Sequence, residues 1–403
     1  MSDHPQTSAG PDTEARRARF AVVALFVING FTYTNVVPWL PAIKDRLELS
    51  NAALGMAIAA MPLGALLTGM LAGPLIARFG SGRVSVAAGL LAVWTLPLVA
   101  VAPNWWVLAG ALFVTGCGDA WCDSAMNAHG LRVQRRYRRT IINTFHAVWS
   151  IAAVAGGLLG AGMAGLHVPI LWHLTGVAVV LTALSAVASR FLLGGPEHAE
   201  RADGHDSSGA RLRLPSGALG ILAALSVLLM LAGAIEDAAA SWGAVYMRDE
   251  VGATLFLAGL PFVACQGMMT LGRLVGDRLT DAFGAVAVAR TGMLLSAVGL
   301  GTALLLGGPV VTIVGFGLCG LGVSTLFPLA LSAAGEIPGV RSGDGVTIVA
   351  WLARAGFLCF PPLIGLAADA TSLRVGLAAI PVAGLVAACL AWSLRPQKAA
   401  HHH

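Results

Sequence analysis

Long, uninterrupted runs of apolar residues constrain this 403-residue chain more than any other feature. A bilayer core about 30 Å thick requires about 20 apolar residues per helix. Only 11% of the residues are charged, against roughly 25% in an ordinary soluble domain. We therefore expect an all-α integral membrane protein, not a soluble enzyme, with twelve transmembrane helices at residues 20–40, 51–76, 84–102, 105–130, 141–164, 169–193, 217–243, 253–275, 285–306, 309–333, 345–368 and 375–394.

One long polar stretch divides these spans into six and six. Its residues are rich in Ser, Gly and charged side chains, which is typical of a flexible linker. The polar, Arg-containing N-terminus predicts no cleaved signal peptide, and the three final His residues resemble a purification-tag remnant. The expected organisation is a cytoplasmic tail (1–19), an N-terminal six-helix bundle (20–193), a cytoplasmic linker (194–216), a C-terminal six-helix bundle (217–395) and a second tail (396–403).

The positions of Lys and Arg predict the orientation. With the N-terminus in the cytoplasm, nineteen of these residues fall on the cytoplasmic side and four on the opposite side, namely Lys44, Arg46, Arg248 and Arg374. Short loops rich in Lys and Arg stay inside, so both termini are expected in the cytoplasm. The net charge of +5 then reflects topology, and we expect no nucleic-acid partner.

The two halves carry short repeated motifs. Ala77-Arg78-Phe79-Gly80 recurs as Asp281-Ala282-Phe283-Gly284, an offset of 204, and Gly116-x-Gly118 recurs as Gly320-x-Gly322 at the same offset. Trp149 recurs as Trp351, at an offset of 202. Anchors in one order at nearly one offset indicate a parallel duplication of six helices.

The twelve-span layout, the long central loop and the glycine-rich loop after the second span resemble the major facilitator superfamily over residues 20–395. Four positions of the family's loop pattern match here, but Ala77 stands where an Asp is expected. The resemblance implies that charges in this loop and its second-half counterpart hold one gate; a purely structural ion-pair network is the alternative. These expected gating residues are Gly73, Arg78, Gly80, Arg83, Arg273, Asp277, Arg278 and Asp281.

A narrower resemblance covers the fourth span. Residues 116–130, GCGDAWCDSAMNAHG, are similar to the corresponding helix of fucose-permease-like bacterial transporters, in which an acidic residue followed four positions later by Asn lies on the cavity wall. The stretches Asn143-x-x-His146-x-x-Trp149 and residues 236–242, EDAAASW, also resemble that group. The resemblance implies a multi-pass protein of the bacterial inner (plasma) membrane. The group's acidic residue near Asn35 is absent here, which puts sugar specificity in doubt.

Physical reasoning selects the same helix independently. A charged group near the bilayer centre costs at least about 2.5–3.5 kcal/mol, so each one is a functional candidate. Asp119, Asp123 and Asn127 are four residues apart and share one helix face. The offset of 204 maps the two carboxylates to Val323 and Phe327, so only one half carries them. Two carboxylates about 6 Å apart repel, so one should hold a proton more tightly than in water. We expect Asp123, and as the alternative Asp119, to couple transport to protons; a structural hydrogen bond is the other interpretation.

Further polar and aromatic residues are expected in the central cavity. Arg354 falls near the midplane and should pair with a carboxylate or meet an anionic substrate. Helix one offers a hydrogen-bonding face, and Trp rings can stack on ligands, although packing alone also explains the aromatic residues. The expected cavity residues are Asn29, Tyr33, Asn35, Asn127, His146, Trp149, Glu236, Asp237, Trp242, Gln266, Phe327, Trp351 and Arg354.

These features together predict a secondary active transporter that moves a small polar, possibly sugar-like solute by alternating access. Two alternatives remain open: proton-antiport efflux of amphipathic compounds, and a transporter-like receptor that does not translocate. No phosphate-binding loop of the Gly-x-x-x-x-Gly-Lys-Ser/Thr type occurs. We expect no enzyme activity, no metal and no cofactor apart from the proton, with a small-molecule substrate and the lipid bilayer as partners of a monomer.

Overall fold

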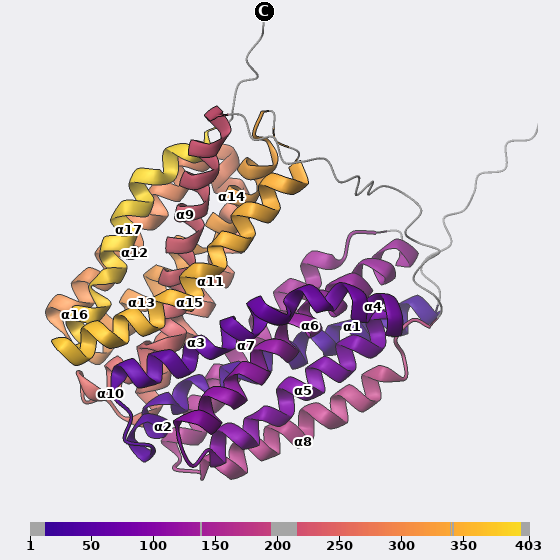
Figure 1. Cartoon of the computed structure of the whole chain (residues 1–403), viewed down its shortest axis with the longest axis horizontal. Coiled ribbons are helices and arrows are strands. Elements are labelled where there is room, and N and C mark those ends of the chain that lie inside the picture. The colour runs from indigo at the N-terminus through magenta and orange to yellow at the C-terminus, as the bar shows by residue number, and fades with distance from the viewer. Residues whose placement is uncertain (1–12, 138, 195–215, 339, 341, 396–403) are drawn as a thin grey trace, which may run out of the picture.

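The computed structural model describes residues 13–137, 139–194, 216–338, 340 and 342–395. These residues form helices and no strand. They are arranged as two bundles, which lie in contact at one end of the molecule and diverge at the other (Figure 1). Residues 1–12 of the expected N-terminal tail (1–19), the expected C-terminal tail 396–403, Arg138, Gly339, Arg341 and most of the linker lie outside the described residues.

The first half contains residues 13–194. Its α-helices are α1 (Thr13–Thr32), α2 (Leu40–Arg46), α3 (Asn51–Thr68), α4 (Ala72–Phe79), α5 (Ser81–Val101), α6 (Trp105–Tyr137), α7 (Ile142–Gly165) and α8 (Ile170–Ser189). Three of them, α5, α7 and α8, begin and end within four residues of the spans expected from hydropathy. Short 3-10 turns join some of them: η1 (Tyr33–Asn35), η2 (Val37–Trp39) and η3 (Gly69–Leu71).

The second half follows the same plan. Its elements are α9 (Ser216–Ser241), α10 (Gly243–Asp249), α11 (Leu255–Phe283), α12 (Ala285–Leu306), α13 (Pro309–Val323), α14 (Leu326–Gly335), α15 (Ser342–Ala370), α16 (Leu373–Leu377), α17 (Ala379–Leu390) and η5 (Ala391–Leu394). Among the described helices, eleven spans are long and apolar enough to cross a membrane, whereas twelve were expected. The twelfth expected span is α6, a single helix whose apolar character is lowered by Asp119, Asp123 and Asn127.

Local sequence signals begin and end these helices in the same way in both halves. Ser50 caps α3 by accepting a hydrogen bond from the Ala53 N–H, and Thr254, 204 residues later, caps α11 through the Leu257 N–H. Gly80 and Gly284, again 204 apart, have φ angles of +88° and +82°. These left-handed conformations favour glycine and separate the second helix of each half from the third.

The two halves meet through small residues at one end, which we call the contact end. There the first turns of α3 pack against α15, where a Cβ on Gly55 would overlap the Pro361 carbonyl oxygen. The equivalent pair is α11 against α7, where a Cβ on Gly157 would lie 2.7 Å from the Phe262 ring. At the opposite, open end α1 and α9 begin and α8 ends (Figure 1).

Large apolar side chains cover much of the outer surface. Leu98, Trp172 and Leu305 are 50%, 73% and 83% exposed. Such extensive apolar exposure is typical of a surface that contacts lipid. The chain is accordingly a multi-pass membrane protein.

Candidate functional site

Asp119 lies at one end of a hydrogen-bond chain that joins three helices of the first half through Asn29. Its Oδ1 accepts a hydrogen bond of 2.8 Å from Asn29 Nδ2 on α1. Asn29 Oδ1 in turn accepts one of 2.7 Å from Trp149 Nε1 on α7. Because the Asn29 amide is fixed at both ends, Asp119 is held in one orientation.

Asp123 lies one turn further along α6, toward the open end, and its surroundings differ. Its side chain is exposed, and Asn127 Nδ2 donates to Asp123 Oδ1 at 3.0 Å. The charges of His146 on α7 and Arg354 on α15 both act on this carboxylate. Asp123 therefore faces titratable and cationic groups from both halves of the molecule.

The second half contributes two carboxylates from α9, both half-buried. Ser241 Oγ donates to Asp237 Oδ2 at 2.6 Å, and the charge of Asp237 acts on the Tyr33 hydroxyl of the first half. The charge of Arg273, on α11, acts on Glu236. Titratable side chains from η1, α6, α7, α9, α11 and α15 thus act on one another between the two bundles, and this set, with Asn29 of α1, is the candidate site.

Of four other residues expected in the cavity, three are buried within the protein and one is largely exposed. Asn35 and Trp242 are fully buried, and Gln266 is only 8% exposed. Asn35 Nδ2 donates to the Phe31 carbonyl oxygen at 2.5 Å, so its amide closes the end of α1 and does not face an open surface. Trp351, in contrast, is 55% exposed. Trp242 belongs to the main apolar core, so its indole packs inside the second half.

Phe327 is half-buried and lies against another ring of the second half. Its ring centroid is 6.4 Å from that of Phe357. This contact joins α14 to α15, the helix that carries Arg354. Phe327 therefore stands beside the candidate site as a packing contact.

The expected gating residues lie mainly on helices, whereas a loop was expected. Arg78 is on α4, and Arg273, Asp277, Arg278 and Asp281 lie on α11, which continues to Phe283. Of the expected gating residues, only Gly80 lies in a turn, because α4 ends just before this positive-φ glycine. The equivalent turn after α11 is formed by Gly284. Gly73 and the side chains of Arg78 and Arg83 are exposed.

One buried polar cluster was not expected from the sequence. Trp39 Nε1 donates to His173 Nδ1 at 3.0 Å, and His173 Nε2 lies 3.2 Å from Asn35 Oδ1. Since Nδ1 accepts a hydrogen bond, the proton of a neutral ring is assigned to Nε2, which donates to Asn35. A single His within the apolar span 169–193 was the available signal. The rule that treats each ionisable side chain within a membrane span as a functional candidate selected Asp123, and it would also have selected His173.

Within the described residues no three His, Cys, Asp or Glu side chains converge as metal ligands. The chemistry that the site supports is hydrogen bonding, ion pairing and proton exchange. The asymmetry between a fixed carboxylate, Asp119, and an exposed one, Asp123, is its most distinctive feature.

Comparison with known proteins agrees with this architecture. A curated relative, an uncharacterised MFS-type transporter of Yersinia pestis, is 29% identical over 366 residues, covering 91% of this chain and 93% of its own. A solved bacterial homologue of the human lysosomal transporter Spinster, inward-facing and occupied, superposes with a TM-score of 0.74 at 13% identity, covering 96% and 97% of the two chains. A point mutant of the nucleoside transporter NupG gives 0.71 at 15% identity, covering 93% and 99%.

The sequence profile of the Major Facilitator Superfamily matches residues 22–284 and 225–403, and so covers nearly the whole chain. Members of this family are transporters and not enzymes. Transporters of this type carry small-molecule substrates within the membrane. This chain is therefore a membrane transporter that belongs to the Major Facilitator Superfamily.

Proposed function

We propose that this protein is a proton-coupled secondary transporter of the bacterial inner membrane, with both termini in the cytoplasm, and that Asp123 is its coupling carboxylate. It moves a small polar solute by alternating access, and we place it in the fucose-permease-like group without assigning it that group's sugar specificity. The observation that carries the proposal is that two carboxylates on one helix face differ in hydrogen bonding and in exposure. Asp119 is fixed by Asn29, whereas Asp123 is exposed between the halves.

A coupling group must exchange its proton with water and respond to the substrate. Asp123 meets both conditions because it is exposed and because the charges of His146 and Arg354 act on it. Protonation of Asp123 removes its attraction to Arg354, which belongs to the opposite half. Proton binding and the separation of the halves are therefore linked through one pair of charges.

The polar character of the site favours a hydrophilic solute. Asn127, Asp237 and Ser241 supply hydrogen-bonding groups, and Arg273 and Arg354 supply cations. A hydroxyl-bearing or zwitterionic molecule can satisfy both kinds of group. An amphipathic drug would leave these polar groups without partners.

The test is proton flux into proteoliposomes, with wild type and Asp123→Asn compared across sugars, nucleosides, carboxylates and cationic drugs. Asn keeps the shape of the side chain and removes its titration. For symport, an added solute should make the external medium alkaline in the wild type. The variant should still exchange labelled solute between the two sides without moving protons.

Asp119→Asn is the matched control, since the hydrogen bond from Asn29 can persist to the new amide oxygen. We expect solute-driven proton flux to remain in this variant. Proton flux retained in Asp123→Asn but lost in Asp119→Asn would transfer the role to Asp119. Acidification of the medium on solute addition would indicate antiport, and wild-type solute flux without any proton movement would contradict coupling altogether.

A further inference from the structure

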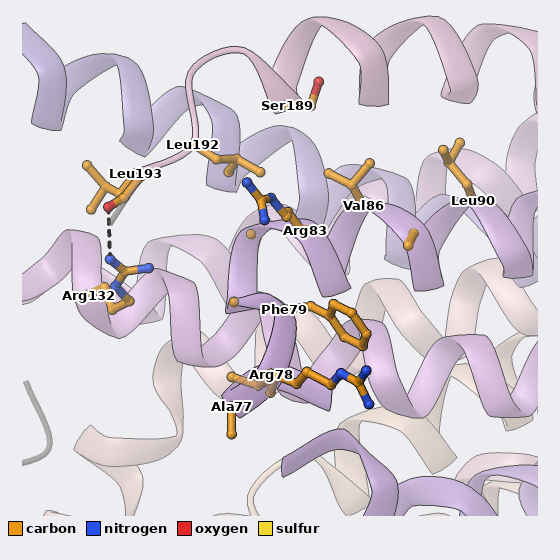
Figure 2. Close-up of a pocket in the computed structure, with 15 residues that line it drawn as sticks. Ala77, Arg78, Phe79, Arg83, Val86, Leu90, Arg132, Ser189, Leu192 and Leu193 are labelled. Carbon is orange, nitrogen blue, oxygen red and sulfur yellow. Dashed lines mark hydrogen bonds between the residues drawn. The ribbon is translucent and has the colours of Figure 1, made fainter. Parts of the chain in front are cut away.

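A basic cavity of about 830 Å³ lies at the open end of the first half, apart from the candidate site (Figure 2). It is formed by the end of α4, the start of α5, the residues after α8, and Arg132 on α6. Three of the fifteen described residues that line it are arginines, Arg78, Arg83 and Arg132, and none of the fifteen is acidic.

Two of the three arginines of this cavity have no acidic partner within the described part of the chain. There, Arg78 and Arg83 form no ion pair with a carboxylate. Ala77, next to Arg78 in the chain, occupies the position where a carboxylate was expected. The α5 helix also begins here, so its positive dipole end adds to the arginine charges. The cavity is thus suited to an anion.

An apolar cavity of about 500 Å³ adjoins the basic one. The two share Phe79, Arg83 and Ala87, and the apolar cavity continues along α5 to Leu91 and across to Trp121. Leu91 is exposed on the outer surface, where lipid is expected. An anionic group and an apolar chain could therefore be bound side by side, with Arg83 at the junction.

We propose that these adjoining cavities bind a membrane phospholipid whose headgroup carries a net negative charge. The phosphate lies among Arg78, Arg83 and Arg132, and one acyl chain follows α5 past Leu91. Basic pockets between transmembrane helices on the cytoplasmic side commonly bind such headgroups. The inference uses the proposed orientation of the open end but does not depend on proton coupling at Asp123.

The buried Arg132 gives this site a structural role. Its guanidinium donates to the carbonyl oxygen of Gly194, the first residue of the linker, at 3.2 Å (Figure 2). His129, one turn earlier on α6, accepts a hydrogen bond from the Leu193 N–H at 3.1 Å. A lipid headgroup bound here would therefore contact the segment that leaves the first half for the second.

Native mass spectrometry of the purified full chain can test the proposal, by titration with phosphatidylglycerol and with phosphatidylcholine of identical acyl chains. We expect the wild type to prefer phosphatidylglycerol. Since each arginine near a membrane surface contributes roughly a fivefold preference for anionic lipid, Arg83→Gln should lower the preference about fivefold and Arg78→Gln/Arg83→Gln about 25-fold. Arg83→Lys keeps the positive charge, so this variant should keep most of the preference for phosphatidylglycerol. That result would show that substitution at this position leaves the site folded.

Arg290→Gln is the matched control, because Arg290 is an exposed arginine of the second half, on α12. The preference of this variant for phosphatidylglycerol should equal that of the wild type. Equal phosphatidylglycerol preference in the double variant and in the wild type would overturn the proposal, because another segment or site would then be responsible. Displacement of the lipid by millimolar glycerol 1-phosphate would overturn it too, since a soluble anion would then suffice without the apolar cavity.

Discussion

The fourth helix of the first half, α6, and its counterpart in the second half, α13 with α14, contact their neighbours through the same glycines. A Cβ on Gly116 would overlap the Met61 carbonyl oxygen, and a Cβ on Gly320 would overlap that of Cys265. Both the glycines and their partners are 204 residues apart. The two halves therefore share one packing scheme around this helix.

The polar side chains on the same two stretches are entirely different. Asp119 and Asp123 of α6 correspond to Val323 and Phe327, and α6 is continuous where the second half breaks between α13 and α14. Packing of the repeat requires its small residues in both halves, because the backbones approach closely there. It does not require the carboxylates, so their presence in one half points to function.

The largest expected effect tests the shared packing. Gly116→Ala and Gly320→Ala should each destabilise the protein by about 2–3 kcal/mol, because the backbone oxygens of Met61 and Cys265 cannot move away easily. Thermal unfolding in detergent measures the loss, which should be similar at the two sites. Gly110→Ala, on α6 with no atom within 4 Å of its added Cβ, should be neutral or stabilising by up to about 1 kcal/mol. Equal behaviour of Gly110→Ala and Gly116→Ala would refute the close contact.

A second, intermediate effect tests the difference between the halves. Trp149 donates to Asn29, whereas its counterpart Trp351 is exposed. Trp149→Phe leaves the Asn29 oxygen without this donor and should cost about 1–3 kcal/mol. Trp351→Phe should change stability by less than about 0.5 kcal/mol. Chemical denaturation of both variants decides the matter, and equal losses would mean that the hydrogen-bond chain contributes nothing.

Much of this architecture is predictable from the sequence because hydropathy and repetition are strong signals. The bounds of α12, Ala285–Leu306, agree with the expected span 285–306. Helix α11 continues eight residues beyond its expected end at 275, since its last turns are amphipathic and leave the apolar segment. A hydropathy ruler detects the membrane-embedded part of a helix and not its extension into water.

The candidate site is only partly predictable for a different reason. Sequence spacing gives the height of a residue in the membrane but not the direction in which its helix faces. Asn29, Asp119 and Trp149 were all expected in the cavity, yet their hydrogen-bond chain depends on the rotation of three helices. Asn35 has the spacing of a cavity residue, but it faces His173. Such contacts join residues more than 80 positions apart, which no local pattern records.

The smallest expected effect concerns the contact end, where the repeat is also broken by one carboxylate. Asp369 of α15 accepts hydrogen bonds of 2.8 Å from the N–H groups of Asn51 and Ala52, the first residues of α3. The equivalent position in the first half is Gly165, which packs against Phe256 of α11 without any charge. The second half thus caps a helix of the first half, and the reverse contact lacks this cap.

Asp369→Asn removes the charge at the α3 N-terminus and should weaken this contact by about 0.5–1 kcal/mol, a two- to fivefold shift toward separation of the halves. The nearby pair of Lys44 and Asp249, 2.5 Å apart, still joins the halves, since an exposed pair contributes up to about 1 kcal/mol. Pulsed electron paramagnetic resonance between spin labels at Asp45→Cys and Thr371→Cys, with the native Cys replaced, measures the shift. Thr254→Ala removes the cap of α11 from within its own half, so it should lower stability by about 1 kcal/mol and leave the label distances unchanged. If Thr254→Ala shifts the distances and Asp369→Asn does not, the carboxylate does not hold the halves together, and the apolar packing of Gly55 and Gly157 does so alone.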